Sequence, residues 1–257
     1  MNSRLNQLHK IRTFELESVI EILNSIGYKI CSTRILEVGA GTGWQAKKLS
    51  EIGYDVHAID LHTSNYNEQR IFDVMDYDGE SIDFPDDYFD VIFSSNVLEH
   101  IPHIRRFQCE IKRVLKPSGV CIHLMPSATW RLWTNISYYF RVIKKLCTHS
   151  SPKSLFRESA RCDYKSLRKR SLLSKVFPSS HGEIGNCISE IYFFSRFYWK
   201  AFFKSCGWSN LNTHSNMLFY SGNSIFGSSM SLRFRYLLHF ILGGSCNIYI
   251  LNKKNEN

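Results

Sequence analysis

RILEVGAGTG, at residues 34–43, joins a short apolar run to three glycines at every second position. The apolar run predicts a buried strand, and the glycines predict a turn after which a helix begins near Trp44. Gly39, Gly41 and Gly43 lack a Cβ, so they can take positive φ and bring backbone N–H groups close to a ligand at a helix start. This geometry is typical of nucleotide binding, although glycine turns also end ordinary strands.

A second apolar strand, Val56 to Ile59, follows a helical segment and ends at Asp60. The order strand, helix, strand fits a βαβ unit, which predicts that the two strands are parallel. A carboxylate at the tip of the second strand can accept two hydrogen bonds from a ribose, and dinucleotide folds place such a group about 20 residues beyond their glycines. Asp60 is therefore the predicted ribose ligand.

Four segments, taken together, resemble successive motifs of the class I S-adenosylmethionine-dependent methyltransferases of type 11. They are ILEVGAGTG, AID at 58–60, FPDDYFDVIFSSNVLEHI at 84–101 and RVLKPSG at 113–119, and their order and spacing also match. The G-x-G-x-G pattern after the acidic Glu37 differs from the G-x-G-x-x-G of nicotinamide enzymes. The resemblance, which covers residues 30–126, implies S-adenosyl-L-methionine as the cofactor.

The resemblance also implies an α/β fold. We expect a Rossmann-like, doubly wound, seven-stranded and mostly parallel sheet with helices on both faces and a basic insertion after the fifth strand. The last strand is expected to be antiparallel and to lie beside the fifth. The whole chain is expected to be one domain, with an N-terminal helix (1–30), a cofactor-binding core (31–130), a basic and aromatic insertion (131–190) and a C-terminal part (191–257).

By position, the resemblance assigns ten residues to the cofactor: Glu37, Gly39, Ala40, Gly41, Gly43, Asp60, Leu61, Asp78, Gly79 and Asn96. Asp78 and Gly79 follow a predicted third strand at Ile71–Val74, where the family places a polar group near the adenine amino group. An acidic surface turn is the alternative for this pair, because Asp and Gly are common turn residues. Asn96 follows a predicted fourth strand at Asp90–Ser94, and ligands of open parallel sheets bind at such carboxyl ends.

Two histidines are candidates for a general base, because imidazole titrates near neutral pH. His100 follows the fourth strand, and a scaffold role is its alternative; His181 lies in a glycine-flanked loop with Glu183. Either residue of that loop is placed to contact an acceptor. Cys121 and His123 fall inside the predicted fifth strand, Val120–Leu124, where we expect them to be core residues. No metal site is predicted.

The net charge of +9 is concentrated in one part of the chain. Residues 144–182 contain ten Lys or Arg residues, whereas Glu158 and Asp163 are the acids of that segment. A solvated insertion is one interpretation, and attraction to anionic lipid headgroups or phosphorylated carriers is another. Nucleic acid is disfavoured, since SSNVLEH replaces the N-P-P-Y type of tetrapeptide after the fourth strand.

The eight cysteines are scattered without a C-x-x-C pair, and the N-terminus lacks a basic-then-apolar leader. We therefore expect reduced thiols in a cytoplasmic protein, with peripheral contact at the inner membrane surface as an option.

Apolar periodicity predicts several further elements. The stripe from Leu16 to Ile26 predicts a helix that covers the cofactor cleft or the sheet edge. Aromatic and basic residues alternate over Trp130–Leu146, which suits a packing helix or a wet–apolar interface. The remaining predicted elements are an amphipathic helix closed by Gly207, a sixth strand at Leu211–Tyr220, a helix at Leu232–Leu242 and a seventh strand at Asn247–Leu251.

The predicted reaction is attack of an acceptor hydroxyl on the sulfonium methyl group of the cofactor. SGNSIFG and GGSCNIYIL resemble endings of bacterial surface-glycan methyltransferases, so a sugar or lipid-linked glycan is the first acceptor considered. A quinone-like lipid, a small amine, or a non-catalytic scaffold that only binds the cofactor are the alternatives.

Overall fold

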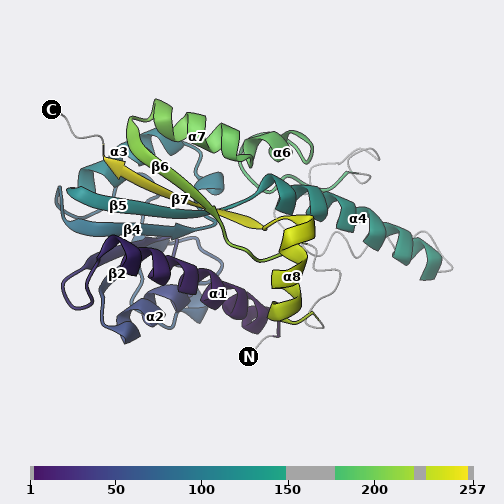
Figure 1. Ribbon diagram of the computed structural model, residues 1–257, viewed down its shortest axis with the longest axis horizontal. Helices are drawn as coiled ribbons and strands as arrows, with labels where there is room; N and C mark the ends of the chain where they lie inside the picture. Colours follow the sequence, from purple (N-terminus) through teal and green to yellow (C-terminus); the bar gives the residue numbers. More distant parts are fainter. Residues whose placement is uncertain (1–2, 149–176, 223–229, 254–257) are drawn as a thin grey trace. The chain divides into compact units, whose positions relative to one another are not determined.

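The computed structural model describes residues 3–148, 177–222 and 230–253 (Figure 1). Seven strands form one sheet in the order β3-β2-β1-β4-β5-β7-β6. They are β1 (Arg34–Val38), β2 (Asp55–Leu61), β3 (Met75–Tyr77), β4 (Phe89–Ser95), β5 (Leu115–Pro126), β6 (Trp208–Ser215) and β7 (Cys246–Lys253). β7 is antiparallel to both β5 and β6, whereas β1 is parallel to β2 and β4. The predicted fold class is confirmed, including the insertion of the last strand beside the fifth.

Seven α-helices are described. They are α1 (Ser3–Ile26), α2 (Trp44–Ile52), α3 (Ile104–Val114), α4 (Ala128–Thr148), α6 (Ser189–Phe193), α7 (Arg196–Ser205) and α8 (Leu232–Leu242). Two short 3₁₀ helices, η1 (Asn67–Gln69) and η2 (Leu98–His100), follow β2 and β4.

Alternating side chains of the strands build a core layer on each face of the sheet. Ile35, Val91 and Ile122 belong to the layer that packs against α1. Their neighbours in sequence, including Leu36 and Ile92, face α3 and α7 on the opposite side. Figure 1 shows α1 and α2 on one side of the sheet and α3 and α7 on the other.

The chain separates into two compact units. Unit 1 comprises Met1–Pro126, Arg196–Asn216 and Cys246–Asn257, and it contains the whole sheet. Unit 2 comprises Ser127–Ser195 and Met217–Ser245, and its described helices are α4, α6 and α8. The single-domain organisation stays a prediction.

The prediction of the third strand at Ile71–Val74 is wrong, because these residues pack under the glycine turn instead of pairing with β2. The backbone N–H of Ile71 donates to the carbonyl of Thr42 in that turn. A Cβ added to Gly43 would lie 2.6 Å from Phe72 Cβ and 3.1 Å from Val74 Cγ2. The strand forms at Met75–Tyr77, immediately after this contact.

The sixth strand is also offset from its predicted range, since β6 ends at Ser215 instead of Tyr220. Asn216 leaves the ladder and its backbone N–H donates to the carbonyl of Cys246, while Met217 takes a φ of +51°. The apolar residues after this bend, including Leu218, are buried in unit 2. Their hydrophobicity therefore reflects packing of another unit and not continuation of the strand.

Other predictions are confirmed. The helix at Leu232–Leu242 has the predicted bounds. Cys121 and His123 are both fully buried, and Ser94 Oγ lies 2.8 Å from His123 Nδ1. Burial lowers the pKa of His123 to about 3, so its imidazole is neutral at neutral pH. Six cysteines whose side chains are described are free thiols: Cys31, Cys109, Cys121, Cys187, Cys206 and Cys246. Most of the basic segment 144–182 lies outside the described residues.

Candidate functional site

The glycine turn after β1 has the backbone conformation that its sequence predicts. Gly39, Gly41 and Gly43 have φ values of +70°, +58° and +72°, which lie in the left-handed region that favours glycine. A Cβ on Gly39 would lie 2.4 Å from Val97 Cγ2, whereas a Cβ on Gly41 would first meet the Tyr66 ring at 3.4 Å. Gly39 therefore lets the turn approach the segment after β4, and Gly41 lies beside an aromatic ring.

Asp60 ends β2 and ties this strand to the glycine turn. Its Oδ2 accepts hydrogen bonds from the Gly41 N–H at 2.8 Å and the Ser64 hydroxyl at 3.0 Å, and its Oδ1 accepts from the Leu61 N–H at 2.8 Å. A carboxylate offers about four lone-pair sites. The Gly41, Leu61 and Ser64 donors use three of these sites, which leaves one. A ribose that displaces the Ser64 hydroxyl would gain a second site, so the carboxylate can accept both ribose hydroxyl groups.

Glu37, which the sequence analysis assigns to the cofactor, is a buried residue at the carboxyl end of β1. Only 2% of its surface is exposed, and no described residue donates a hydrogen bond to its Oε2. Burial raises the pKa of Glu37 to about 8, although the Ala46 N–H and the Arg12 charge oppose that rise. A buried acid with an open oxygen fits a cationic ligand group such as a sulfonium or an ammonium.

The N-terminal helix contributes residues that the sequence analysis did not assign to the site. His9 of α1 stacks on Trp44 with ring centroids 4.2 Å apart, and Thr13 Oγ1 accepts a hydrogen bond from Trp44 Nε1 at 3.0 Å. The other half of α1 buries Leu16, Val19 and Leu23 against the sheet. The helix therefore lies beside the glycine turn and over the central strands of the sheet. The alternative of a sheet edge is wrong, because the edge strands are β3 and β6, and cover of the cofactor cleft stays a prediction.

Arg12 of α1 reaches the carboxyl end of β4. Its Nη1 donates to Ser95 Oγ at 3.0 Å and to Glu15 Oε2 at 2.6 Å. With the Asn96 amide turned so that its oxygen faces the guanidinium, Arg12 Nη2 also donates to that oxygen at 3.2 Å. No local pattern in the sequence marks this contact, because Arg12 and Ser95 lie 83 residues apart.

Asn96 follows β4 and adopts a left-handed backbone. Its φ is +57°, and its N–H donates to the carbonyl of Leu124 at 2.8 Å. Non-glycine residues occupy this region at a cost, and such residues cluster at ligand sites. Because Val97 lies against Gly39, this segment and the glycine turn adjoin, which is the juxtaposition expected from the sequence.

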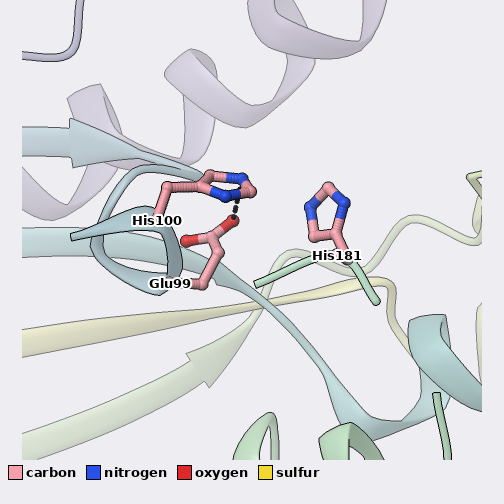
Figure 2. A group of neighbouring side chains, drawn as sticks. All are labelled: Glu99, His100 and His181. Carbon is pink, nitrogen blue, oxygen red and sulfur yellow. Dashed lines mark ion pairs between the residues drawn. The ribbon is translucent and has the colours of Figure 1, made fainter. Parts of the chain in front are cut away.

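His100 and Glu99 form a pair in η2 (Figure 2). His100 Nε2 lies 3.8 Å from Glu99 Oε1, and the His100 side chain is 43% exposed while that of Glu99 is 1% exposed. Burial raises the pKa of Glu99 to about 8. The arrangement presents an accessible imidazole over a buried carboxyl group, which suits proton transfer to or from a bound molecule.

His181, also labelled in Figure 2, belongs to unit 2 and lies in a loop fixed by Glu190. Glu190 Oε1 accepts from the backbone N–H groups of His181 and Gly182 at 2.6 and 2.8 Å. Its Oε2 lies 2.8 Å from Arg131 Nε in an ion pair whose side chains are 0% and 3% exposed. The His181 ring packs on Trp130, with centroids 4.7 Å apart.

The remaining candidates occupy more exposed positions. Asp78 Oδ1 accepts from the N–H groups of Glu80 and Ser81 at 2.7 and 2.8 Å, so it closes a turn, and these bonds lower its pKa. A Cβ on Gly79 would lie 3.0 Å from Leu61 Cδ2, so Gly79 and Leu61 are neighbours. Glu183 is exposed in unit 2. The role of Asp78 and Gly79 near an adenine stays a prediction.

Comparison with known proteins finds relatives among methyltransferases. A family model described as "Methyltransferase domain" matches residues 36–123. "Ubiquinone biosynthesis O-methyltransferase" of Rickettsia prowazekii is 30% identical over 130 residues, which are 47% of this chain and 51% of that protein. "Biotin biosynthesis bifunctional protein BioHC" of Cellvibrio japonicus is 30% identical over 104 residues, which are 38% of this chain and 21% of that protein. The chain spans about half the length of the ubiquinone enzymes it matches.

Solved structures show the same fold at lower identity. An S-adenosylmethionine-dependent methyltransferase from Mesorhizobium loti has a TM-score of 0.52 and 12% identity, with 91% of this chain and 96% of that chain covered. A further such enzyme from Archaeoglobus fulgidus has a TM-score of 0.51 and 14% identity, with 93% and 94% covered. These two likenesses concern the fold alone.

Proposed function

We propose, from the premise that the chain belongs to the class I S-adenosylmethionine-dependent methyltransferases, that it methylates a hydroxyl group of a quinone-like lipid. S-adenosylmethionine is the methyl donor of that family. The observation that supports a cofactor role is the hydrogen bond from the Gly41 N–H to the Asp60 carboxylate, because it joins the glycine turn to the end of β2, the two parts of the βαβ unit that would hold an adenosyl group. The acceptor class rests on the names of the ubiquinone enzymes.

Residues of unit 1 provide the groups that would hold the cofactor. Asp60 would accept the ribose hydroxyls, with Leu61 and Gly79 beside the base. The glycine turn, from Gly39 to Gly43, would let the backbone approach closely. Glu37 and Arg12 would face the charged methionine end, since one is a buried acid and the other a cation at the same edge of the sheet.

The chain's own residues then have two tasks in the reaction. Bound S-adenosylmethionine supplies a methyl group on a positively charged sulfur, which leaves as a neutral thioether. Holding the acceptor oxygen in line with the methyl carbon supplies much of the rate. His100 would take the proton of the hydroxyl as the oxygen–carbon bond forms. Glu99, whose pKa burial raises to about 8, would stabilise the resulting imidazolium once its own carboxyl group is ionised.

We expect His100→Ala to lower kcat by about 10²- to 10⁴-fold, because general base catalysis contributes that range. The KM for S-adenosylmethionine should stay unchanged, since His100 is assigned to the acceptor. His103→Ala is the matched control, because His103 is an exposed histidine three residues further along. Equal turnover of the His100 and His103 variants would remove His100 from the mechanism and leave His181 as the remaining histidine candidate.

A second prediction concerns pH. Burial holds the pKa of Glu37 at about 8, so this carboxyl is protonated in the free protein at pH 7. A cationic ligand favours the carboxylate, so binding releases a proton. Affinity for the cofactor should therefore rise between pH 6 and about 8, by up to about tenfold per unit, and level off above that value.

Calorimetric titrations in buffers of different ionisation enthalpy measure this proton release. Glu37→Gln should bind more weakly and lose the pH dependence. Glu99 also has a raised pKa, of about 8, so Glu99→Gln is the matched variant. If Glu37→Gln retains the parent's pH slope, the assignment of Glu37 to the cationic end is wrong.

The acceptor class is tested by product formation. The protein is incubated with S-adenosylmethionine labelled in its methyl group and with three separate acceptors: a hydroxylated quinol with a short isoprenoid tail, a primary amine and a lipid-linked sugar. Label in the quinol is the expected result. Label in the sugar alone would restore the glycan acceptor and overturn this proposal, whereas cofactor binding without any product would indicate a scaffold.

To methylate a lipid acceptor, the chain would have to contact the membrane that contains the lipid, at the inner surface of the cell. We propose that the basic residues of 144–182 assist this contact electrostatically, because clustered Lys and Arg are attracted to anionic lipids. Among the described helices, none is both long and apolar enough to cross a bilayer.

A further inference from the structure

Helix α8 of unit 2 presents an apolar face to solvent. Phe234, Leu237, Phe240 and Ile241 are 50%, 60%, 65% and 82% exposed. Their spacing of three or four residues places them along one side of the helix. The opposite side carries Arg235, which is buried and donates from Nη1 to the carbonyl of Phe219 at 3.3 Å. The usual arrangement of a surface helix is therefore reversed, because the polar residue is inside and the large apolar residues are outside.

Helix α4 of the same unit has a similar exposed stripe. Leu132, Tyr139, Phe140 and Ile143 are 43%, 38%, 60% and 55% exposed, and they recur at helical spacing. The start of α4 contacts the end of α8, since Trp133 Nε1 donates to the carbonyl of Leu242 at 3.0 Å. Unit 2 also holds most of the large exposed apolar side chains among the described residues.

The charge on these two helices has a single sign. Neither α4 nor α8 contains Asp or Glu. Arg233 is exposed and falls within the apolar side of α8, and Lys144 is exposed beside Ile143 near the end of α4. Large apolar side chains gathered on the exposed side of a helix mark an interaction site. The partner must accept aromatic and aliphatic side chains and also carry negative charge.

We propose that the exposed faces of α8 and of the end of α4 dock on an anionic phospholipid bilayer. This apolar–basic surface consists of Arg233, Phe234, Leu237, Phe240 and Ile241 of α8 with Tyr139, Phe140, Ile143 and Lys144 of α4. Amphipathic helices with large apolar side chains beside Lys and Arg lie in the headgroup region of such bilayers. A second copy of this chain fits less well, because pairing the same surface would bring like charges together.

Flotation of the whole chain with vesicles, without cofactor or acceptor, tests the proposal separately from the reaction. We expect binding to vesicles of phosphatidylcholine with phosphatidylglycerol, and at least tenfold weaker binding to phosphatidylcholine alone. High salt should weaken the binding to anionic vesicles, since the Arg and Lys contribution is screened. Equal affinity for both vesicle types, or none for either, would overturn the proposal.

Variants locate the binding on this surface. Leu237→Ser with Ile241→Ser should lower affinity for anionic vesicles by tenfold or more, because both side chains leave water on docking. Arg233→Glu should lower it severalfold and reduce its salt dependence. Ile26→Ser with Ile52→Ser is the matched control, since these unit 1 side chains are 47% and 39% exposed. The control should bind like the parent and, like the α8 variants, keep the parent's circular dichroism spectrum.

Two outcomes would show either that another segment binds the membrane or that the apolar–basic surface has another partner. If Arg168→Gln, Lys169→Gln and Arg170→Gln together abolish binding while the α8 variants retain it, the basic segment alone attracts the membrane. If sedimentation shows a dimer that Leu237→Ser with Ile241→Ser converts to a monomer, with vesicle binding unchanged, the surface joins two copies of the chain. Either result contradicts the proposal.

Discussion

Asp60→Ala should weaken binding of S-adenosylmethionine by about 10²- to 10⁴-fold, which is the largest effect on affinity that we expect from a single substitution. A hydrogen bond to a charged group contributes about 1.5–3 kcal/mol, and a ribose makes two with one carboxylate. The substitution also removes the acceptor that holds the Gly41 N–H. Equilibrium dialysis with labelled cofactor measures the change.

Asp55→Ala is the matched control for this prediction. Asp55 begins the same strand but pairs with Arg34 at the surface, where its side chain is 53% exposed. Exposed ion pairs contribute about 0–1 kcal/mol to stability, and Asp55 lies at the opposite end of β2 from Asp60. The control should bind the cofactor like the parent. Similar affinities of the Asp60 and Asp55 variants would contradict the ribose assignment.

Glu190→Ala should lower the stability of unit 2 by about 3–5 kcal/mol, because it leaves the Arg131 guanidinium buried without its carboxylate. Burial already lowers the pKa of Arg131, while the charge of Glu190 opposes that shift. The substitution also removes the acceptor of two N–H groups in the loop of His181. Urea unfolding followed by near-ultraviolet circular dichroism, which reports on Trp130 and Trp133, measures the loss.

Two further variants sharpen this test. Glu183→Ala changes an exposed acid of the same loop and should alter stability by no more than about 0.5 kcal/mol. Removing both charges, with Arg131→Met and Glu190→Leu, should cost less than Glu190→Ala, because no unpaired charge remains in the interior. A Glu190→Ala protein as stable as the Glu183→Ala protein would show that the buried pair does not hold the loop.

The first βαβ unit was predictable because its signals are local. Glycine is needed where the backbone takes a left-handed φ, and the glycines at 39, 41 and 43 all do so. The apolar run of β1 is buried on both faces, and β2 buries Ala58 and Ile59 on opposite faces, so an apolar composition identifies both strands. Asp60 follows directly from the end of the second run.

The third and sixth strands were misplaced because apolar side chains do not reveal what they pack against. Phe72 and Val74 fill the space under Gly43, and Leu218 is buried in unit 2. Both segments have strand-like composition. The backbone N–H groups of Ile71 and Asn216 instead donate to the carbonyls of Thr42 and Cys246, and no local pattern indicates these partners. Tertiary context overrides propensity here.

The part played by Arg12 was not predictable from its position. It precedes the glycine turn by more than twenty residues, and its role depends on how α1 crosses the carboxyl end of β4. The same holds for Glu190, which is one of several acids in the sequence until its burial against Arg131 is known. Long-range charge pairs carry no signal at fixed spacing.

Equilibrium dialysis of the unmodified chain against methyl-labelled S-adenosylmethionine measures whether a cofactor site lies between the glycine turn and Asp60, on which the proposed cofactor-binding and catalytic roles depend. We expect saturable binding of one molecule per chain, displaced by S-adenosylhomocysteine and insensitive to NAD. Absence of saturable binding at low salt, with the chain folded, would contradict this expectation.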